Sequence, residues 1–174
     1  MDNISTEKMS KTKLLVLTAL LFAIALVLSI IEDSLPPLPI AVPGVKFGLS
    51  NIAVMYALFF LGKGNAFSLA ILKALFVLFT RGAIAGILSL FGGILSIIIM
   101  ILLLFFFKEK ISYLVISIFG AVFHNIGQFL VITFIYADLN IWSYLPVLLI
   151  SGLIAGIVTA TLLKFVLPVF KRLN

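Results

Sequence analysis

The feature that most constrains this chain is a succession of long apolar segments separated by short polar ones. A helix needs about 20 predominantly apolar residues, within a range of about 17–25, to cross the hydrocarbon core of a bilayer. Only 10% of the 174 residues are charged, against roughly 25% in a soluble domain, so lipid must be the solvent for most of the surface. The pattern predicts an all-α integral membrane protein, a bundle of six transmembrane helices at residues 14–31, 47–61, 66–80, 83–107, 111–136 and 145–165.

These helices are expected to form one domain, residues 14–168, between a cytoplasmic segment, 1–13, and a basic cytoplasmic tail, 169–174. No small-residue cleavage site follows the first apolar segment, so we interpret it as a permanent helix. The second and third segments are short for a span. We therefore expect one of them to be tilted, broken or shielded by its neighbours.

The lysine and arginine residues predict the orientation. With six spans, both termini and the second and fourth loops share one side, which has nine cations: Lys8, Lys11, Lys13, Lys63, Lys108, Lys110, Lys164, Lys171 and Arg172. The opposite side has two, Lys46 and Arg81. By the positive-inside rule, we expect a plasma-membrane protein with both termini in the cytoplasm and the proline-rich loop, 36–43, outside. This placement also explains the net charge of +6 without a nucleic-acid partner.

Two groups of polar residues interrupt the apolar helices. Lys73 lies in the middle of the third helix, and Arg81 follows eight residues later on the same face. The fifth helix has three polar residues near its midpoint, His124, Asn125 and Gln128. Because ionisable and polar groups inside a membrane are costly, they mark function by default. We expect them to line a binding cavity open to the outside, together with Lys46, Asn51 and the neighbouring Ser50.

Each group also has a purely structural interpretation. Lys73 could be a lysine that extends its ammonium to a nearby membrane interface. The polar residues of the fifth helix could form a hydrogen-bond clamp to another helix, worth about 0.6 kcal/mol per bond. The cavity interpretation is favoured because all three polar residues share one sector of the helix.

The sequence also constrains the ligand. Lys73 has no acid three or four residues away, and no predicted helix contains one. A buried cation without a partner is costly, so either an anionic ligand or a neutral lysine that donates to His124 or Asn125 would resolve it. We expect a small, at least partly anionic ligand, with its headgroup on Lys73 and Arg81 and its body on aromatic side chains such as Phe76 and Phe123.

No motif for catalysis is present. The chain has no cysteine, one histidine and no carboxylate pair within the membrane, so we expect no enzyme, no metal site and no cofactor. It also lacks a GxxxxGK[ST] phosphate-binding loop, so another subunit must supply the energy if the chain takes part in pumping.

Small residues four positions apart predict close helix contacts. Such pairs let helix backbones approach one another, and they occur at Ala19/Ala23, Gly82/Gly86, Ser89/Gly93 and Gly152/Gly156. They are explained either by packing within the chain or, for Ala19 and Ala23, by a face that binds a partner membrane protein.

Three sequence motifs carry a family resemblance. The runs 35–39 and 43–52 (LPPLP and PGVKFGLSNI), 120–128 (GAVFHNIGQ), and 144–146 with 151–156 (YLP and SGLIAG) resemble the signatures of the Gx transporter family. That family is also catalogued as heptaprenyl diphosphate synthase component I. The resemblance covers about residues 13–167.

The family is similar to the substrate-binding S-components of energy-coupling factor (ECF) transporters. This implies a six-helix bundle that binds a small nutrient, or a cofactor or quinone precursor, from outside. It also implies a transmembrane coupling subunit, which Ala19 and Ala23 would contact, and two cytoplasmic ATPases. The loop at 34–45 would cover the pocket.

Two alternatives belong to other classes. The family's second name implies an accessory membrane component of heptaprenyl diphosphate synthase, in isoprenoid or menaquinone side-chain synthesis. The chain would be a non-catalytic subunit, because its three aspartates, Asp2, Asp33 and Asp138, are widely separated. A self-sufficient small transporter or channel is the other alternative, and the lack of internal repeats argues against it.

Overall fold

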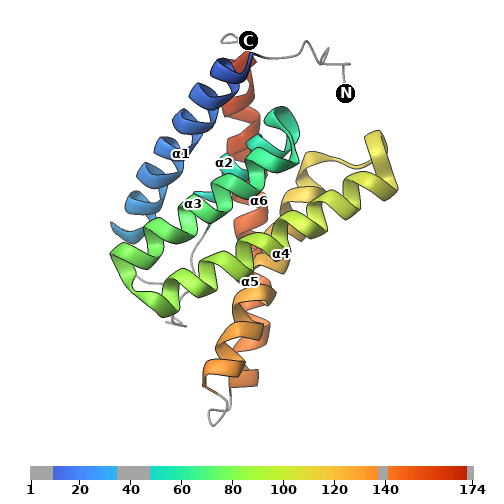
Figure 1. The fold of residues 1–174 in the computed structure, drawn as a ribbon. Coiled ribbons are helices and arrows are strands. Elements are labelled where there is room, and N and C mark those ends of the chain that lie inside the picture. Colours follow the sequence, from blue (N-terminus) through green and yellow to red (C-terminus); the bar gives the residue numbers. More distant parts are fainter. Residues whose placement is uncertain (1–9, 35–47, 137–140, 172–174) are drawn as a thin grey trace.

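The computed structural model describes residues 10–34, 48–136 and 141–171, which form an all-helical bundle (Figure 1). Five helices in this part of the chain are long and apolar enough to cross a membrane. They are α1 (Lys11–Ser34), α3 (Lys63–Arg81), α4 (Ala83–Phe107), α5 (Tyr113–Ile135) and α6 (Leu145–Lys171). The chain is therefore a multi-pass membrane protein, as its composition predicts.

The second predicted helix, 47–61, is a short and largely buried element in the structure. It consists of α2 (Asn51–Tyr56) and a π-helical turn, η1 (Ala57–Leu61). All residues from Ile52 to Leu58 are buried, so protein covers most of this element. This is the shielding that a helix too short to span requires.

Several predicted boundaries differ from the structure, most of them at the ends of the first, third and last helices. The third helix begins at Lys63 and has 19 residues, because the predicted turn at 62–65 is confined to Gly62, whose φ of 95° suits glycine alone. The first helix continues through Glu32 to Ser34. The last helix continues to Lys171, into the predicted tail. Two short 3-10 helices, η2 (Lys108–Lys110) and η3 (Ile141–Tyr144), precede α5 and α6.

Glycines bring the backbones of α4, α5 and α6 into direct contact. A Cβ on Gly156 would lie 2.5 Å from the Cα of Ile118, and one on Gly152 would lie 2.9 Å from the Cα of Val122. Gly127 of α5 likewise faces the Cα of Gly92. These small residues therefore serve packing within the chain.

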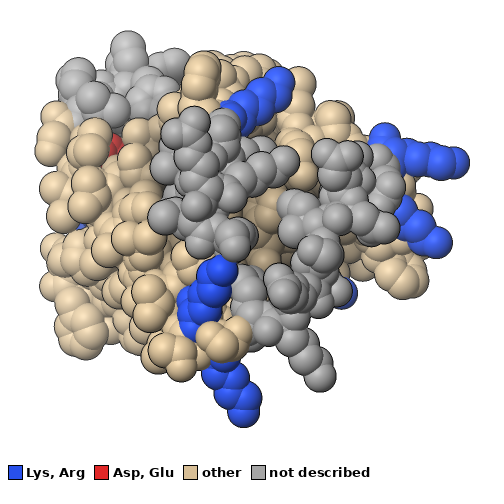
Figure 2. Space-filling model, turned by 90° about the horizontal axis from the view of Figure 1, so that it is seen from above, with Lys and Arg blue, Asp and Glu red and all other residues tan. Residues whose placement is uncertain are grey.

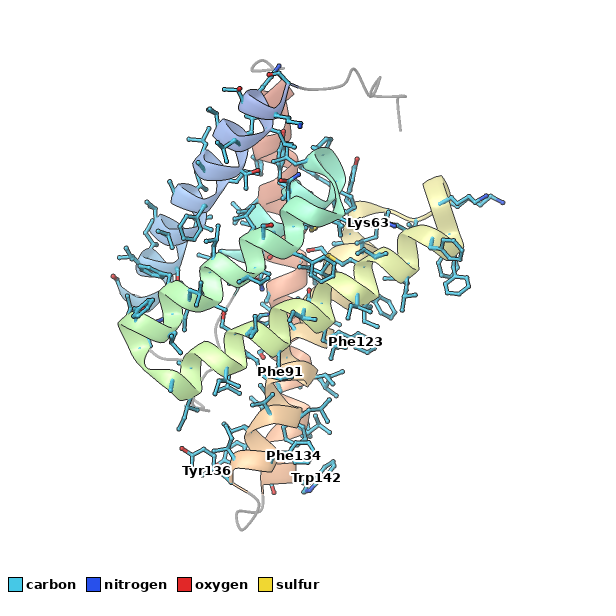
Figure 3. The ribbon with its side chains drawn as sticks, in the orientation of Figure 1. Lys63, Phe91, Phe123, Phe134, Tyr136 and Trp142 are labelled. Atoms are coloured by element: carbon cyan, nitrogen blue, oxygen red, sulfur yellow. The ribbon has the colours of Figure 1, made fainter. Side chains whose placement is uncertain are left out.

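The cations gather at the end of the bundle where α1 begins and α6 ends. Figure 2, which views the molecule from this end, shows lysine and arginine side chains projecting from it. Exposed lysines occur at the start of α1 (Lys11), the start of α3 (Lys63, labelled in Figure 3) and the α4–α5 turn (Lys108 and Lys110).

Candidate functional site

A cavity of about 390 Å³ lies between the helices, within the range of about 300–1,000 Å³ that is typical of ligand pockets. Its wall includes the last turns of α1 and α3, the first turns of α4 and the C-terminal half of α5. These parts lie at the end of the bundle opposite the start of α1 (Figure 1). The polar side chains in the wall are Ser29, Glu32, Ser50, Asn51, Lys73, Arg81, Ser89, His124, Asn125 and Gln128.

The structure brings together six of the seven residues predicted to bind ligand. Asn51, Lys73, Arg81, His124, Asn125 and Gln128 come from α2, α3 and α5, and all of them line this cavity. The seventh, Lys46, lies outside the described residues.

Lys73 is held inside the bundle. Its side chain is buried, and its ammonium donates a hydrogen bond to the Oδ1 atom of Asn51. It therefore does not extend to a membrane interface. The sequence also allowed Lys73 to donate to His124 or Asn125. In the structure its acceptor is instead Asn51, on α2.

Arg81, the last residue of α3, is bound to α1. Its Nη2 atom donates to the Oγ atom of Ser29 at 3.0 Å and to the carbonyl oxygen of Ser29 at 3.4 Å. Gly82, with a φ of 92°, then turns the chain into α4. The guanidinium is thereby fixed where α1, α3 and α4 meet.

Sequence reasoning missed Glu32. The sequence predicts that the first helix ends at residue 31, which puts Glu32 in a loop and leaves no acid in any helix. This prediction is wrong, because Glu32 lies within α1. Glu32 is buried, lines the cavity and accepts a hydrogen bond from the backbone N–H of Gly48 at 2.5 Å. Its helical spacing from Ala25 and Ser29, both buried, is the signal that could have placed it on the inner face.

Two polar residues of α5, Asn125 and His124, differ in their hydrogen bonds. The Nδ2 atom of Asn125 donates to the carbonyl oxygen of Leu148 at 2.9 Å and to Ser151 Oγ at 3.1 Å, so this amide clamps α5 to α6. His124 is also buried, and its Nδ1 atom has no hydrogen-bond partner among the described residues. Gly92 makes room for it, since a Cβ there would lie 3.0 Å from the Cε1 atom of His124.

The two phenylalanines expected to contact the ligand do not line the cavity in the described part of the chain. Neither Phe76 nor Phe123 is among the described residues that line the cavity, and the apolar wall includes Val77, Leu88 and Tyr136 instead. Phe123 stacks on Phe119, with ring centroids 6.4 Å apart. In Figure 3 its ring lies on the outside of the bundle. Lipid solvates large apolar side chains well, so a phenylalanine in such a helix can face outward without cost.

The predicted partner-binding face on α1 is accessible. Ala19 and Ala23 are exposed, and so are the larger residues on the same side, Val16, Val27 and Ile30. In Figure 1, α1 lies at the edge of the bundle, with this length of helix open on one side.

Comparisons with known proteins show the fold and the family. The structure is similar to one described as the S component of a bacterial ECF transporter, with a TM-score of 0.71 and 18% sequence identity over 94% of this chain and 98% of that chain. At this identity the likeness is one of fold. No curated protein matches the chain. The family model described as heptaprenyl diphosphate synthase component I matches residues 21–166, and the chain therefore belongs to that family, as its sequence motifs indicate.

Proposed function

We propose that this protein is the substrate-binding membrane subunit of an ECF-type uptake transporter. Its ligand is a small, partly anionic nutrient or a cofactor or quinone precursor. The observation that carries this proposal is a cavity lined by two cationic side chains, Lys73 and Arg81, inside a bundle with the fold of an S component.

The polar lining supports binding of an anion. The side chains of Lys73 and Arg81 each carry several N–H donors and no acceptor atom of their own, and the neighbouring Asn51 and Gln128 add amide donors. The two cations outnumber Glu32, the one carboxylate of the described lining, so an anionic ligand would offset the remaining positive charge of this buried site.

The placement of the cavity supports uptake from outside. It lies at the end of the bundle that carries Arg81, opposite the end with Lys11, Lys63, Lys108 and Lys110. If the lysine-rich end is cytoplasmic, the cavity belongs to the outer half of the membrane. A ligand from outside could then bind before any ATP is hydrolysed.

The proposed partners are a transmembrane coupling subunit and two cytoplasmic ATPases. The accessible small residues of α1, Ala19 and Ala23, offer a surface for close helix contact. The sequence has no phosphate-binding loop of the GxxxxGK[ST] type, so the energy of transport would come from these partners.

An accessory role in heptaprenyl diphosphate synthesis is the second candidate, and membership of the family favours it.

The deciding experiment has two parts. The chain is purified from membranes, and the small molecules that leave with it are identified by mass spectrometry. The chain is then placed in liposomes with and without the coupling subunit and ATPases, and accumulation of the identified molecule is measured. Accumulation by the chain alone contradicts the proposal, and a stoichiometric requirement for the chain in prenyl diphosphate synthesis supports the second candidate.

A further inference from the structure

The charges that line the cavity restrict the charge of a ligand that fills it. Among the described lining residues, Lys73 and Arg81 are cationic and Glu32 is the one carboxylate, so two positive charges and one negative give a formal lining charge of +1. Lys73 lies within electrostatic range of both Glu32 and Arg81. A ligand in this cavity therefore meets all three charges together.

Each of the three charged groups is held by a neighbour. Glu32 accepts from the Gly48 N–H, and Lys73 donates to Asn51. Arg81 donates to Ser29, which lies one turn before Glu32 on α1. Because these bonds fix the side chains, the carboxylate cannot easily turn away from a ligand that binds the two cations.

A single carboxylate on the ligand matches this arrangement. Its one negative charge neutralises the lining, and its two oxygens can accept from both Lys73 and Arg81. A phosphate monoester carries about −1.5 to −2 at pH 7 and would leave excess negative charge beside Glu32. In a buried site, such like-charge contact is far more costly than in water.

We propose that the cavity takes a small molecule with a single carboxylate, and that Glu32 determines specificity by excluding phosphorylated and multiply anionic molecules. This inference rests on the proposed function, because it assumes that the same cavity is the substrate site. Lys73 and Arg81 bind the carboxylate, while Glu32 accepts a hydrogen bond from a hydroxyl or N–H elsewhere on the ligand.

The test compares two probes that share one ring, benzoate and phenyl phosphate. Their dissociation constants for the purified full-length chain in nanodiscs are measured by ligand-observed NMR titration. The wild-type chain should bind benzoate at least about tenfold more tightly than phenyl phosphate. Glu32→Gln keeps an oxygen that can accept from Gly48 but removes the charge. In this variant the preference for benzoate over phenyl phosphate should fall below about threefold.

A matched control removes the same charge elsewhere. Glu109→Gln alters η2, between α4 and α5, and should leave the preference for benzoate at its wild-type value. A third probe, benzene-1,3-dicarboxylate, requires no variant: its second carboxylate should make it bind the wild-type chain more weakly than benzoate does.

Three results would overturn the inference. In the first, the wild-type chain binds phenyl phosphate or the dicarboxylate as tightly as it binds benzoate. In the second, it shows no saturable binding of benzoate. In the third, the Glu32→Gln chain melts at the wild-type temperature and still has the wild-type ratio of the dissociation constants for phenyl phosphate and benzoate. Failure of the proposed function is seen separately, in the liposome assay. If the wild-type chain prefers benzoate but shows no uptake with the coupling subunit and ATPases, the transporter role is rejected. The inference about the charge of the ligand is then unaffected.

Discussion

At the scale of single residues, the hydrogen-bonded pair of Lys73 and Asn51 is the part of the cavity wall that bears most directly on ligand binding. Lys73 is 5% exposed in a helix that is otherwise apolar at its middle. The amide oxygen of Asn51 satisfies one of the three ammonium donors, so further acceptors are needed. A ligand that supplies them gains a charge-assisted hydrogen bond, worth about 1.5–3 kcal/mol.

Lys73→Met should remove the bound small molecule while the chain still folds. Methionine keeps an unbranched side chain and removes the charge, so affinity for the co-purifying molecule should fall by at least about tenfold. The measurement is quantitative mass spectrometry of the purified chain. Lys164→Met, which removes an exposed lysine of α6, is the control and should retain the molecule. Unchanged affinity in Lys73→Met would show that the cationic cavity is not the binding site.

At the scale of helices, the contact between α5 and α6 depends on glycine. Gly156→Ala places a Cβ 2.5 Å from the Cα of Ile118, where only backbone movement can make room. The melting temperature should therefore fall, by an amount that corresponds to about 1–3 kcal/mol.

Gly64→Ala is the matched control for this substitution. Gly64 lies in the first turn of α3, and a Cβ there has nothing within 4 Å. Because alanine favours a helix over glycine by up to about 1 kcal/mol, this variant should be as stable as the wild type or more stable. Equal melting temperatures for the two variants would mean that the close α5–α6 approach is absent.

The exposed face of α1 makes a second prediction at this scale. Ala23→Trp places a large side chain where a partner helix would approach, so co-purification with a co-expressed coupling subunit should be lost while ligand binding persists. Ile150→Trp, at an exposed position of α6, is the control and should leave the complex intact. A normal yield of complex from Ala23→Trp would place the coupling contact elsewhere.

At the scale of the whole molecule, the exposed lysines at the end of the bundle opposite the cavity predict the orientation in the membrane. The chain has no cysteine, so single cysteines can report it in intact cells with a membrane-impermeant thiol reagent. Ser34→Cys, at the cavity end, should be labelled, and Gly64→Cys, at the lysine-rich end, should be labelled only after the membrane is opened. Both positions are exposed. The reverse pattern of labelling would invert the proposed topology and turn the cavity to the cytoplasm.

The sequence by itself determined the helical membrane class, the family and most of the candidate site. Apolar length decides what crosses a bilayer, and polar residues within such segments are rare enough to stand out. Lys73, Arg81, His124 and Gln128 could be identified for that reason before any contact was known. The bounds of α4, 83–107, were also predicted correctly, because glycine at 82 and lysine at 108 interrupt a continuous apolar run.

Only the tertiary structure decided which faces meet. In lipid, an apolar side chain is stable whether it faces the bilayer or the bundle, so the sequence could not tell that Phe123 points outward and Leu88 inward. The polarity of Glu32 marked the end of the apolar segment, but the backbone stays helical for two more residues and brings this carboxylate onto the buried face. Asn125 was identified as polar and buried, yet its role as a clamp depends on Leu148 and Ser151, which are distant in sequence. These facts depend on how neighbouring helices are placed, and no local pattern encodes that placement.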